Sequence, residues 1–317
     1  MRFVIVALFL PLLAAAEPGP TPREVRLDPD GDILPPGALA RLGSTRFREV
    51  SAVRITFSPD GSRAICSDDG NVRVWDLKTG KLLQVWPLPE DFEGVVSEDG
   101  RLAVRVKDRG ADVWDVPGNK LVRTLGNGRA RFTAAAVSPD GKSVATAARW
   151  ARPSPVRVWD LASGADRAVG AFDSDIQTLF FLDGGRTLMV VLSDDWAVAF
   201  DAATGLERYR KQLHPRALLT PAGNWFLALR PTGIELFEAA TGKPVPEFKY
   251  PPVTNDLHRL ALSSDGTRLA LGDHSKTVVW DLVAGKELAR WPRKVQSVAF
   301  SPDGRTVAVV ADGLRHF

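Results

Sequence analysis

The chain has 317 residues, of which 44% are hydrophobic and 25% are charged. This balance excludes bulk disorder and allows a large buried core. The 41 basic and 38 acidic side chains nearly cancel, which leaves a formal net charge of +3. Because the lysines and arginines are not clustered along the sequence, we expect neither nucleic acid nor an anionic membrane as a partner.

The N-terminus has the pattern of a secretory signal peptide. Arg2 precedes an apolar run over residues 3–13, and three alanines follow before Glu17. The run is shorter than the roughly 20 residues that span a bilayer, and small residues before a cut are typical of a signal peptidase site. We predict a signal peptide over residues 1–16 and export to the periplasm or the medium. A retained anchor and a misassigned start are the alternatives.

Residues 17–36 contain six prolines and little apolar material. Proline-rich segments of this kind are extended and do not join a packed core. We predict a linker here, followed by one domain over residues 37–317.

A turn signature recurs along this domain. Ser-Pro-Asp-Gly or a close variant appears at residues 58–61, 97–100, 138–141, 263–266 and 301–304, with degenerate copies at 182–185 and 220–223. The seven copies follow one another at about 40 residues, the period of a four-stranded propeller blade. Proline presets φ, aspartate can bond its own backbone, and glycine accepts a positive φ.

Each copy predicts four short strands. An alternating segment precedes the turn and an apolar strand follows it, as in residues 102–106 and 188–192. A third segment ends in Trp-Asp, Phe-Asp or Phe-Glu, and a second turn such as Lys78-Thr79-Gly80 leads into the fourth. Runs of β-branched and aromatic residues between glycine, proline and aspartate turns predict strands and leave no room for long helices.

These elements resemble the WD40-repeat family, in a bacterial, secreted form. The resemblance implies an all-β, seven-bladed WD40-like β-propeller. The chain departs from the family pattern because no blade has the Gly-His dipeptide. The tight-turn aspartate falls at Asp69, Asp108 and Asp194. Pro153, Pro231 and His274 stand in its place elsewhere, so we expect apolar packing to carry most of the stability.

Closure of the ring is predicted from the similarity of an N-terminal segment to a fourth strand near the C-terminus. Residues 39–42, Leu-Ala-Arg-Leu, match Leu-Ala-Arg-Trp at 288–291 in a fourth strand. We therefore expect the N-terminal strand to complete the last blade together with residues 297–317. Phe317 stands one residue short of the expected tryptophan, which leaves either a shortened third strand or a truncated chain.

The sequence contains no recognised catalytic motif. Neither a G-x-S-x-G nucleophile elbow nor a phosphate-binding loop occurs. The four histidines lack metal-ligand spacing, so no cofactor or metal is predicted. The single cysteine, Cys66, is predicted to be a buried residue of a strand. The aspartate pairs at 68–69 and 194–195 are predicted to form turns.

Two sets of residues are candidates for binding a partner. Arg54, Arg216 and Arg259 share one position at the start of first strands and could hold an acidic partner or an anion; salt bridges between blades are the alternative. Trp150 and Trp196 fall in predicted loops, where aromatic side chains can anchor a protein partner or pack on neighbouring loops.

The predicted function is that of a monomeric, non-catalytic scaffold for protein–protein interaction outside the cytoplasm. The partner's identity does not follow from the sequence, because function on such folds lies in surface loops. The alternatives are an extracytoplasmic propeller enzyme or small-ligand binder, and an accessory module of a larger protein.

Overall fold

A computed structural model covers the chain. It describes residues 7–11, 40–42, 54–68, 70–88, 92, 94–107, 110–126, 131–149, 153–213, 218–230, 233–245, 248–251, 257, 259–292 and 294–311. The chain divides into two compact units, Met1–Val85 with Asp256–Phe317, and Trp86–Asn255. Each unit is described by itself.

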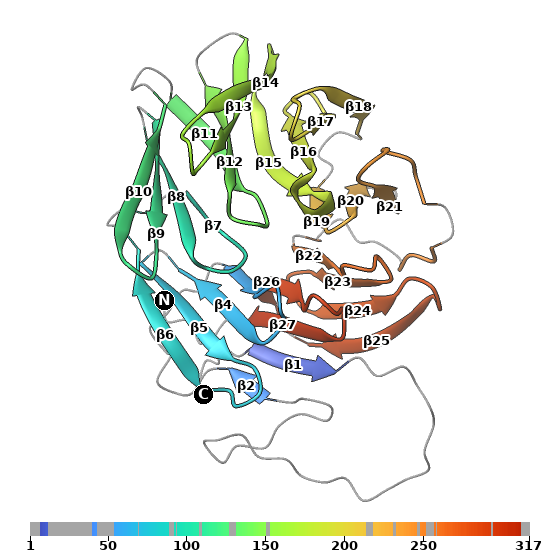
Figure 1. Cartoon of the computed structure of the whole chain (residues 1–317). Coiled ribbons are helices and arrows are strands. Elements are labelled where there is room, and N and C mark those ends of the chain that lie inside the picture. The colour runs from blue at the N-terminus through green and yellow to red at the C-terminus, as the bar shows by residue number, and fades with distance from the viewer. Residues whose placement is uncertain are drawn as a thin grey trace, which may run out of the picture. The chain divides into compact units, whose positions relative to one another are not determined.

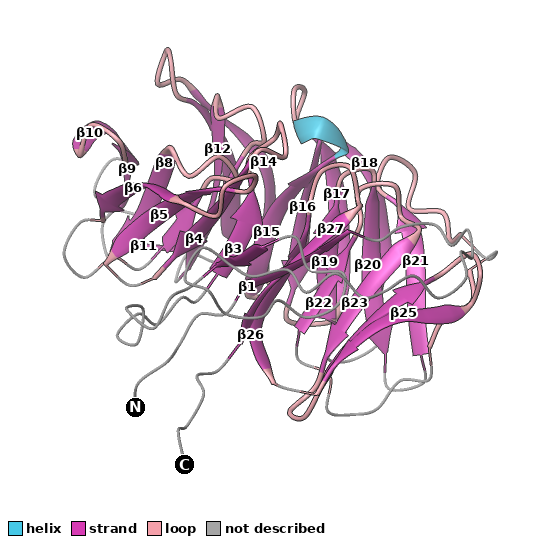
Figure 2. Cartoon of the chain, turned by 90° about the horizontal axis from the view of Figure 1, so that it is seen from below, coloured by secondary structure: helices cyan, strands magenta, loops and turns pink. Residues whose placement is uncertain are grey.

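The described residues form strands joined by turns, with one short 3₁₀ turn at Asp183–Gly185 (Figure 2). The strands make seven antiparallel sheets. This confirms the all-β class.

Five of the sheets are regular, since each has four strands that follow one another in the chain. In the first unit these are the sheets β3 (Arg54–Phe57), β4 (Arg63–Ser67), β5 (Asn71–Asp76), β6 (Leu82–Pro87), and β22 (Arg259–Leu262), β23 (Arg268–Gly272), β24 (Thr277–Asp281), β25 (Lys286–Trp291). The last two residues of β6 fall in the second unit. In the second unit they are β7 (Gly94–Val96), β8 (Leu102–Lys107), β9 (Gly110–Asp115), β10 (Lys120–Leu125); β11 (Arg131–Val137), β12 (Ser143–Arg149), β13 (Ser154–Asp160), β14 (Asp166–Phe172); and β15 (Ile176–Leu182), β16 (Thr187–Leu192), β17 (Trp196–Asp201), β18 (Glu207–Gln212).

The sixth sheet has three strands, β19 (Leu218–Ala222), β20 (Trp225–Arg230) and β21 (Gly233–Glu238). A fourth strand would begin near Pro244, which forms only a single bridge with Phe237. The segment that follows β21 reads K-P-V-P-E-F-K-Y-P-P. Proline has no amide hydrogen to donate to a ladder. This composition disfavours a fourth strand, and the described residues of the segment form none.

The seventh sheet is composite and corrects the predicted closure. Its order is β2 (Ala40–Leu42), β1 (Ala7–Pro11), β27 (Thr306–Ala311), β26 (Val295–Phe300) (Figure 1). The N-terminal strand β2 does not pair with the C-terminal strands directly. It pairs with β1, which in turn pairs with β27 through Leu10–Val307 and Pro11–Thr306.

The closure as predicted is therefore not supported. Five regular blades form where the sequence predicts seven, and the third strand of the last sheet comes from the apolar N-terminal run instead of from the residues after Ala311. The physical reason is that β27 is apolar and buried, so it needs a neighbour on its open edge. The apolar run at residues 7–11 meets that need. Residues 312–317 and the predicted linker at 17–36 lie outside the described part of the chain.

Burial falls from the second strand of a sheet to the fourth. All six residues of β16 are buried, whereas the side chains of β18 are exposed or half-buried. Second strands have a strand on each side and a sheet packed on each face, which explains their continuous apolar sequence. In the second unit one such core joins alanines of β12 and valines of β13 to Leu188, Val190 and Phe200.

Side chains on fourth strands also form hydrogen bonds between neighbouring sheets of the second unit. Arg123 on β10 donates to the carbonyls of Leu161 and Ala162 at 3.2 and 3.1 Å. Arg167 on β14 donates to the carbonyl of Ala202. In the next sheet along the chain, Tyr209 on β18 donates to that of Ala239 at 2.7 Å. The acceptor carbonyls lie just after Trp-Asp, Phe-Asp and Phe-Glu. In these three sheets, the recurring dipeptide therefore precedes the carbonyl that accepts a hydrogen bond from the preceding sheet.

Candidate functional site

The aligned arginines occupy equivalent positions, as the sequence predicts. Arg54 pairs with Ser67 and Arg259 with Gly272, each partner lying six residues after its turn glycine. Ser297 has the same place in β26. Arg216 lies outside the described residues.

The structure gives the two described arginines different surroundings. Arg259 is half-buried and donates through Nε to the carbonyl of Gln296 in the neighbouring sheet. Ser297 accepts a 3.2 Å hydrogen bond from the amide of Ile55. Strand β26 contacts both β22 and β3, so the two arginines are not brought to adjacent strands. Arg259 thus joins two sheets, while Arg54 is exposed at the start of β3 and available to a partner.

The two loop tryptophans also separate. Trp150 lies outside the described residues. Trp196 is the first residue of β17, not a loop residue, and it packs against the core cluster that contains Val198 and Leu192. The prediction that it stands in a loop is wrong. Its side chain is half-buried in the fold, which weakens it as an anchor for a partner.

The five Ser-x-Asp-Gly turns are built alike. In each, the serine hydroxyl donates to the aspartate carboxylate at 2.5–2.6 Å. The same carboxylate oxygen accepts the amide two residues on at 3.0–3.1 Å. The serine hydroxyl accepts the amide five residues on at 2.9–3.0 Å. The turn glycines have φ between 66° and 73°, a region that favours glycine.

These bonds stabilise the charged carboxylates. The hydroxyl of Ser58 and the amide and hydroxyl of Ser62 lower the pKa of Asp60 to about 2. The hydroxyl of Ser138 likewise lowers the pKa of Asp140. Bonding to the ionised form explains the direction. The turn aspartates are therefore ionised and bonded within their own turns, which makes them parts of the scaffold.

In the tight turn between second and third strands, the aspartate that accepts the backbone amides lies one residue before the predicted position. Asp68 accepts the amides of Gly70 and Asn71 at 2.8 and 2.6 Å. Asp273 accepts those of Ser275 and Lys276, both at 2.7 Å. An aspartate, Asp273, thus forms the turn in the β22–β25 sheet. The sequence prediction that His274 takes its place is wrong. Asp69 and Asp108 lie outside the described residues, and Asp194 accepts from the hydroxyl of Ser174.

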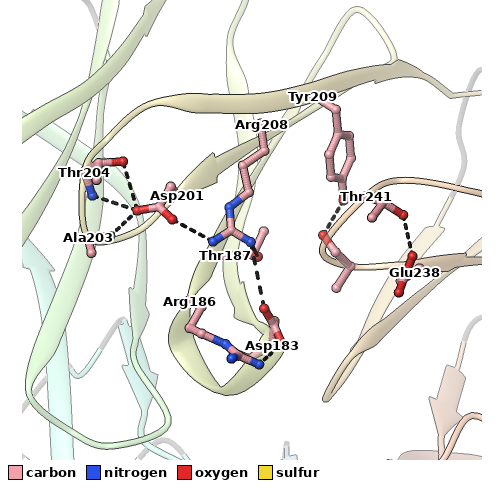
Figure 3. A network of polar contacts seen from close by, with 11 residues as sticks. Asp183, Arg186, Thr187, Asp201, Ala203, Thr204, Arg208, Tyr209, Glu238 and Thr241 are labelled. Atoms are coloured by element: carbon pink, nitrogen blue, oxygen red, sulfur yellow. Dashed lines mark hydrogen bonds and ion pairs between the residues drawn. The ribbon is translucent and has the colours of Figure 1, made fainter.

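The structure contains a polar network around Asp183 that was not predicted from the sequence (Figure 3). Asp183 is buried and has a φ of 55°. Its carboxylate accepts from Arg186 at 2.6 Å and lies 3.8 Å from Arg208. Arg208 also bonds the hydroxyl of Thr187 at 2.9 Å and the carboxylate of Asp201 at 2.6 Å.

This network replaces the missing serine of the degenerate turn Leu-Asp-Gly-Gly. Hydrogen bonds from Arg208 and Thr204 hold the pKa of Asp201 well below its usual range. The signal in the sequence was an aspartate one position early in the turn, together with an arginine on the fourth strand. The network links the turn after the first strand to the second, third and fourth strands of the same sheet.

A second buried charge lies on β9. Asp112 is 3% exposed and bonds Thr124 at 3.0 Å, Arg105 at 3.2 Å, and Lys107. Burial raises the pKa of this carboxyl, but the hydrogen bonds from Lys107, Thr124 and Arg105 outweigh burial and lower it. The guanidinium of Arg105 also stands over the ring of Trp114, 5.8 Å from its centroid.

A repeat tryptophan is hydrogen-bonded in the core of the β11–β14 sheet. Trp159 donates through Nε1 to the hydroxyl of Thr146 at 2.8 Å, and both side chains are buried. In the preceding sheet Arg105 takes the place of Thr146, and the Nε1 of Trp114 has no hydrogen-bond partner among the described residues. In the β3–β6 sheet the same position is Cys66, whose thiol pKa is raised by burial to about 12.

Among the described residues no group of three or more histidine, cysteine, aspartate or glutamate side chains could hold a metal ion. Within the same ranges, no helix has the length and apolar character that a membrane crossing requires.

Comparison with known proteins agrees with the repeat pattern. The family described as WD domain, G-beta repeat matches residues 41–76. The chain is 26% identical to nuclear distribution protein nudF of Aspergillus niger over 56% of this chain and 44% of the relative. It is 25% identical to protein groucho of Drosophila melanogaster over 54% of this chain and 24% of that protein. The chain therefore spans less than half the length of the curated relatives it matches.

Two solved structures share the fold. The Cps50 (Swd1) β-propeller domain of Myceliophteria thermophila aligns with a TM-score of 0.61 at 16% identity, over 84% of this chain and 98% of that one. Hydrazine synthase of Kuenenia stuttgartiensis aligns with a TM-score of 0.57 at 17% identity, over 83% of this chain and 96% of that one. At these identities the likeness concerns the fold alone.

The repeats, the four-stranded sheets and these similarities define an all-β propeller protein. Within that class, the chain is similar to the WD40-repeat propellers.

Proposed function

We propose that this chain is a non-catalytic WD40-repeat scaffold that binds another protein outside the cytoplasm. One observation carries the proposal: the polar groups that recur with the repeat are bonded inside the fold. The turn aspartates bond their own turns, and Arg259 joins two sheets. Recurring polar residues of this kind maintain the frame, which leaves the exposed surface to recognise a partner.

Arg54 is the residue we assign to partner binding. It is exposed at the start of β3, at the end of the hairpin opposite the Ser58–Gly61 turn. A guanidinium in this place suits a carboxylate on an acidic segment of the partner, because it can donate two parallel hydrogen bonds.

Affinity capture from the extracytoplasmic fraction tests this function. The full chain is expected to retain one protein in a stoichiometric amount. Arg54→Ala should weaken that complex about tenfold, the effect of roughly 1.4 kcal/mol. Arg63→Ala is the matched control, since Arg63 is exposed at the other end of the same hairpin. Failure to retain any protein would contradict the scaffold, and an unchanged affinity of Arg54→Ala would contradict the site.

The arrangement of the sheets is part of the proposal. Seven sheets follow from seven repeats, and five of them are regular, which supports a seven-bladed propeller. Electron-microscopic averages viewed along the propeller axis would count the blades. Any count other than seven, five included, would contradict this arrangement.

Export through residues 1–16 is the remaining part. Arg2, the apolar run and the three alanines support it. The mass of the protein recovered outside the cytoplasm should lack residues 1–16. Recovery with these residues retained would contradict cleavage.

A further inference from the structure

Strand β1 joins two parts of the last sheet, which lies entirely within the first unit. On one side it pairs with β27, where Leu10 lies opposite Val307. On the other side it pairs with β2, where Leu8 lies opposite Arg41. Strand β2 stands at the end of the sheet, next to β1. In the described part of the chain, β1 is therefore the only strand that holds β2 against the C-terminal strands (Figure 1).

Strand β27 needs a neighbour in the position of β1. Its residues Val307, Ala308, Val309 and Val310 are at most 2% exposed, and their side chains belong to two apolar clusters of the unit. Strand β26 covers one edge of β27. The amides and carbonyls of the other edge also need hydrogen-bond partners, because buried main-chain groups are nearly always paired. An extended segment beside β27 supplies these partners.

The segment that fills this position is uncharged. Strand β1 reads Ala-Leu-Phe-Leu-Pro and has no polar side chain. All of its residues belong to the predicted signal peptide, residues 1–16. Cleavage after Ala16 would therefore remove the neighbour of β27, together with the strand that holds β2 in the sheet.

We propose that this cleavage turns the last sheet into an acceptor for an extended apolar segment of the protein partner. The acceptor forms only when residues 1–16 are removed, so it rests on the proposed function. The partner segment has the length and chemistry of β1 and runs antiparallel to β27, as β1 does. In strand addition the main-chain hydrogen bonds supply affinity and the side chains supply specificity. A charged segment is disfavoured, because β27 is buried.

A labelled synthetic peptide tests the acceptor. The peptide has the sequence of residues 5–13, Ile-Val-Ala-Leu-Phe-Leu-Pro-Leu-Leu, with a lysine tail for solubility. Fluorescence anisotropy measures its dissociation constant. The processed chain, which begins at Glu17, should bind the peptide at least about tenfold more tightly than the full chain, in which β1 occupies the site. A Leu10→Pro peptide is the matched control and should bind at least about tenfold more weakly, because proline cannot donate to a ladder.

Hydrogen exchange locates the bound peptide. Binding to the processed chain should slow exchange along Thr306–Ala311, the residues of β27. Strand β23, Arg268–Gly272, lies in another sheet of the same unit and should not change. Slower exchange along β23 without a change along β27 would place the peptide elsewhere and overturn the proposal.

A variant of the full chain makes the test independent of truncation. Leu10→Pro in the full chain should weaken the pairing of β1 with β27, so this variant should bind the wild-type peptide more tightly than the wild-type full chain does. Val4→Pro is its matched control, since Val4 precedes β1, and it should leave the affinity unchanged. Circular dichroism shows whether each chain is folded, and the full-chain variant decides if the processed chain is not.

Three results would overturn the proposal: no binding of the peptide by a folded processed chain, equal affinity for the Leu10→Pro peptide, or full protection of Thr306–Ala311 in the processed chain without peptide. The last result would mean that another segment, such as residues 312–317, covers the edge. Retention of residues 1–16 in the exported protein would contradict the proposed export without changing the peptide result, so the two failures are distinguishable.

Discussion

The phenol of Tyr209 donates a 2.7 Å hydrogen bond to the main-chain carbonyl of Ala239, which lies in the neighbouring sheet of the same unit. Ala239 is fully buried, and burial raises the pKa of Tyr209, so the phenol remains a donor at neutral pH. This contact fastens an outer strand to the turn that follows Phe237-Glu238.

Tyr209→Phe should lower the free energy of unfolding by about 1–2 kcal/mol, because it leaves a buried carbonyl unpaired. Urea denaturation measures the change. Arg210→Ala is the control on the same strand. Its exposed pair with Glu207 should contribute little to the free energy of unfolding, because solvent screens the two charges. Equal effects of the two changes would show that the contact between sheets does not matter.

The glycine beside Tyr209 is expected to be sensitive. Gly242 has a φ of 67°, and a Cβ there would lie 2.6 Å from the Tyr209 ring. Gly184 has a φ of 61° with nothing within 4 Å of a Cβ. Gly184→Ala should cost about 1 kcal/mol for backbone strain, and Gly242→Ala should cost clearly more. Equal losses of unfolding free energy would mean that the ring moves aside freely.

Thr146→Val tests the buried hydrogen bond of Trp159. The change keeps the volume but removes the acceptor from the buried Nε1 of Trp159. We expect a loss of about 1–3 kcal/mol in the free energy of unfolding, the cost of an unpaired buried donor. A double-mutant cycle with Trp159→Phe isolates the bond, since Thr146→Val should have little effect once the indole N–H is gone. Persistence of the full loss in the cycle would rule this explanation out.

The turn aspartates predict acid sensitivity. The pKa of Asp60 is lowered from 3.8 to about 2, and the pKa of Asp140 is lowered as well. A lowered pKa in the folded state means that the stabilisation is complete above pH 3.8 and is lost as pH falls towards 2. Urea midpoints should therefore be level above about pH 5 and decline below pH 4. Ser58→Ala should raise the pKa of Asp60 and reduce the decline due to that turn. A midpoint that is constant down to pH 2 would contradict this account.

The N-terminal strand predicts an effect of processing. Because β1 pairs with β27, a chain lacking residues 1–16 should lose protection along Thr306–Ala311. Hydrogen exchange followed by mass spectrometry would show faster exchange in this peptide. Strand β23 of the same unit, Arg268–Gly272, serves as the internal reference and should not change. Identical protection in both chains would mean that β1 does not cover this edge.

The sequence by itself determined the repeat, the turns and the strand class, because these depend on local chemistry. Serine, aspartate and glycine at fixed spacing close the same turn wherever they occur, as the five matching geometries show. The equivalence of Arg54 and Arg259 followed from the same spacing, since strands of equal length place equal positions at equal points of a ladder.

Only the tertiary structure decided which groups meet across sheets. No local pattern states that Arg259 reaches Gln296, that Trp196 packs into a core, or that Arg208 joins Asp201 near Asp183. The sequence likewise did not determine which strand pairs with β27, because any apolar segment of suitable length can pair with a buried edge. Contacts between residues distant in the chain depend on how sheets pack, and packing is a property of the whole unit, not of one repeat.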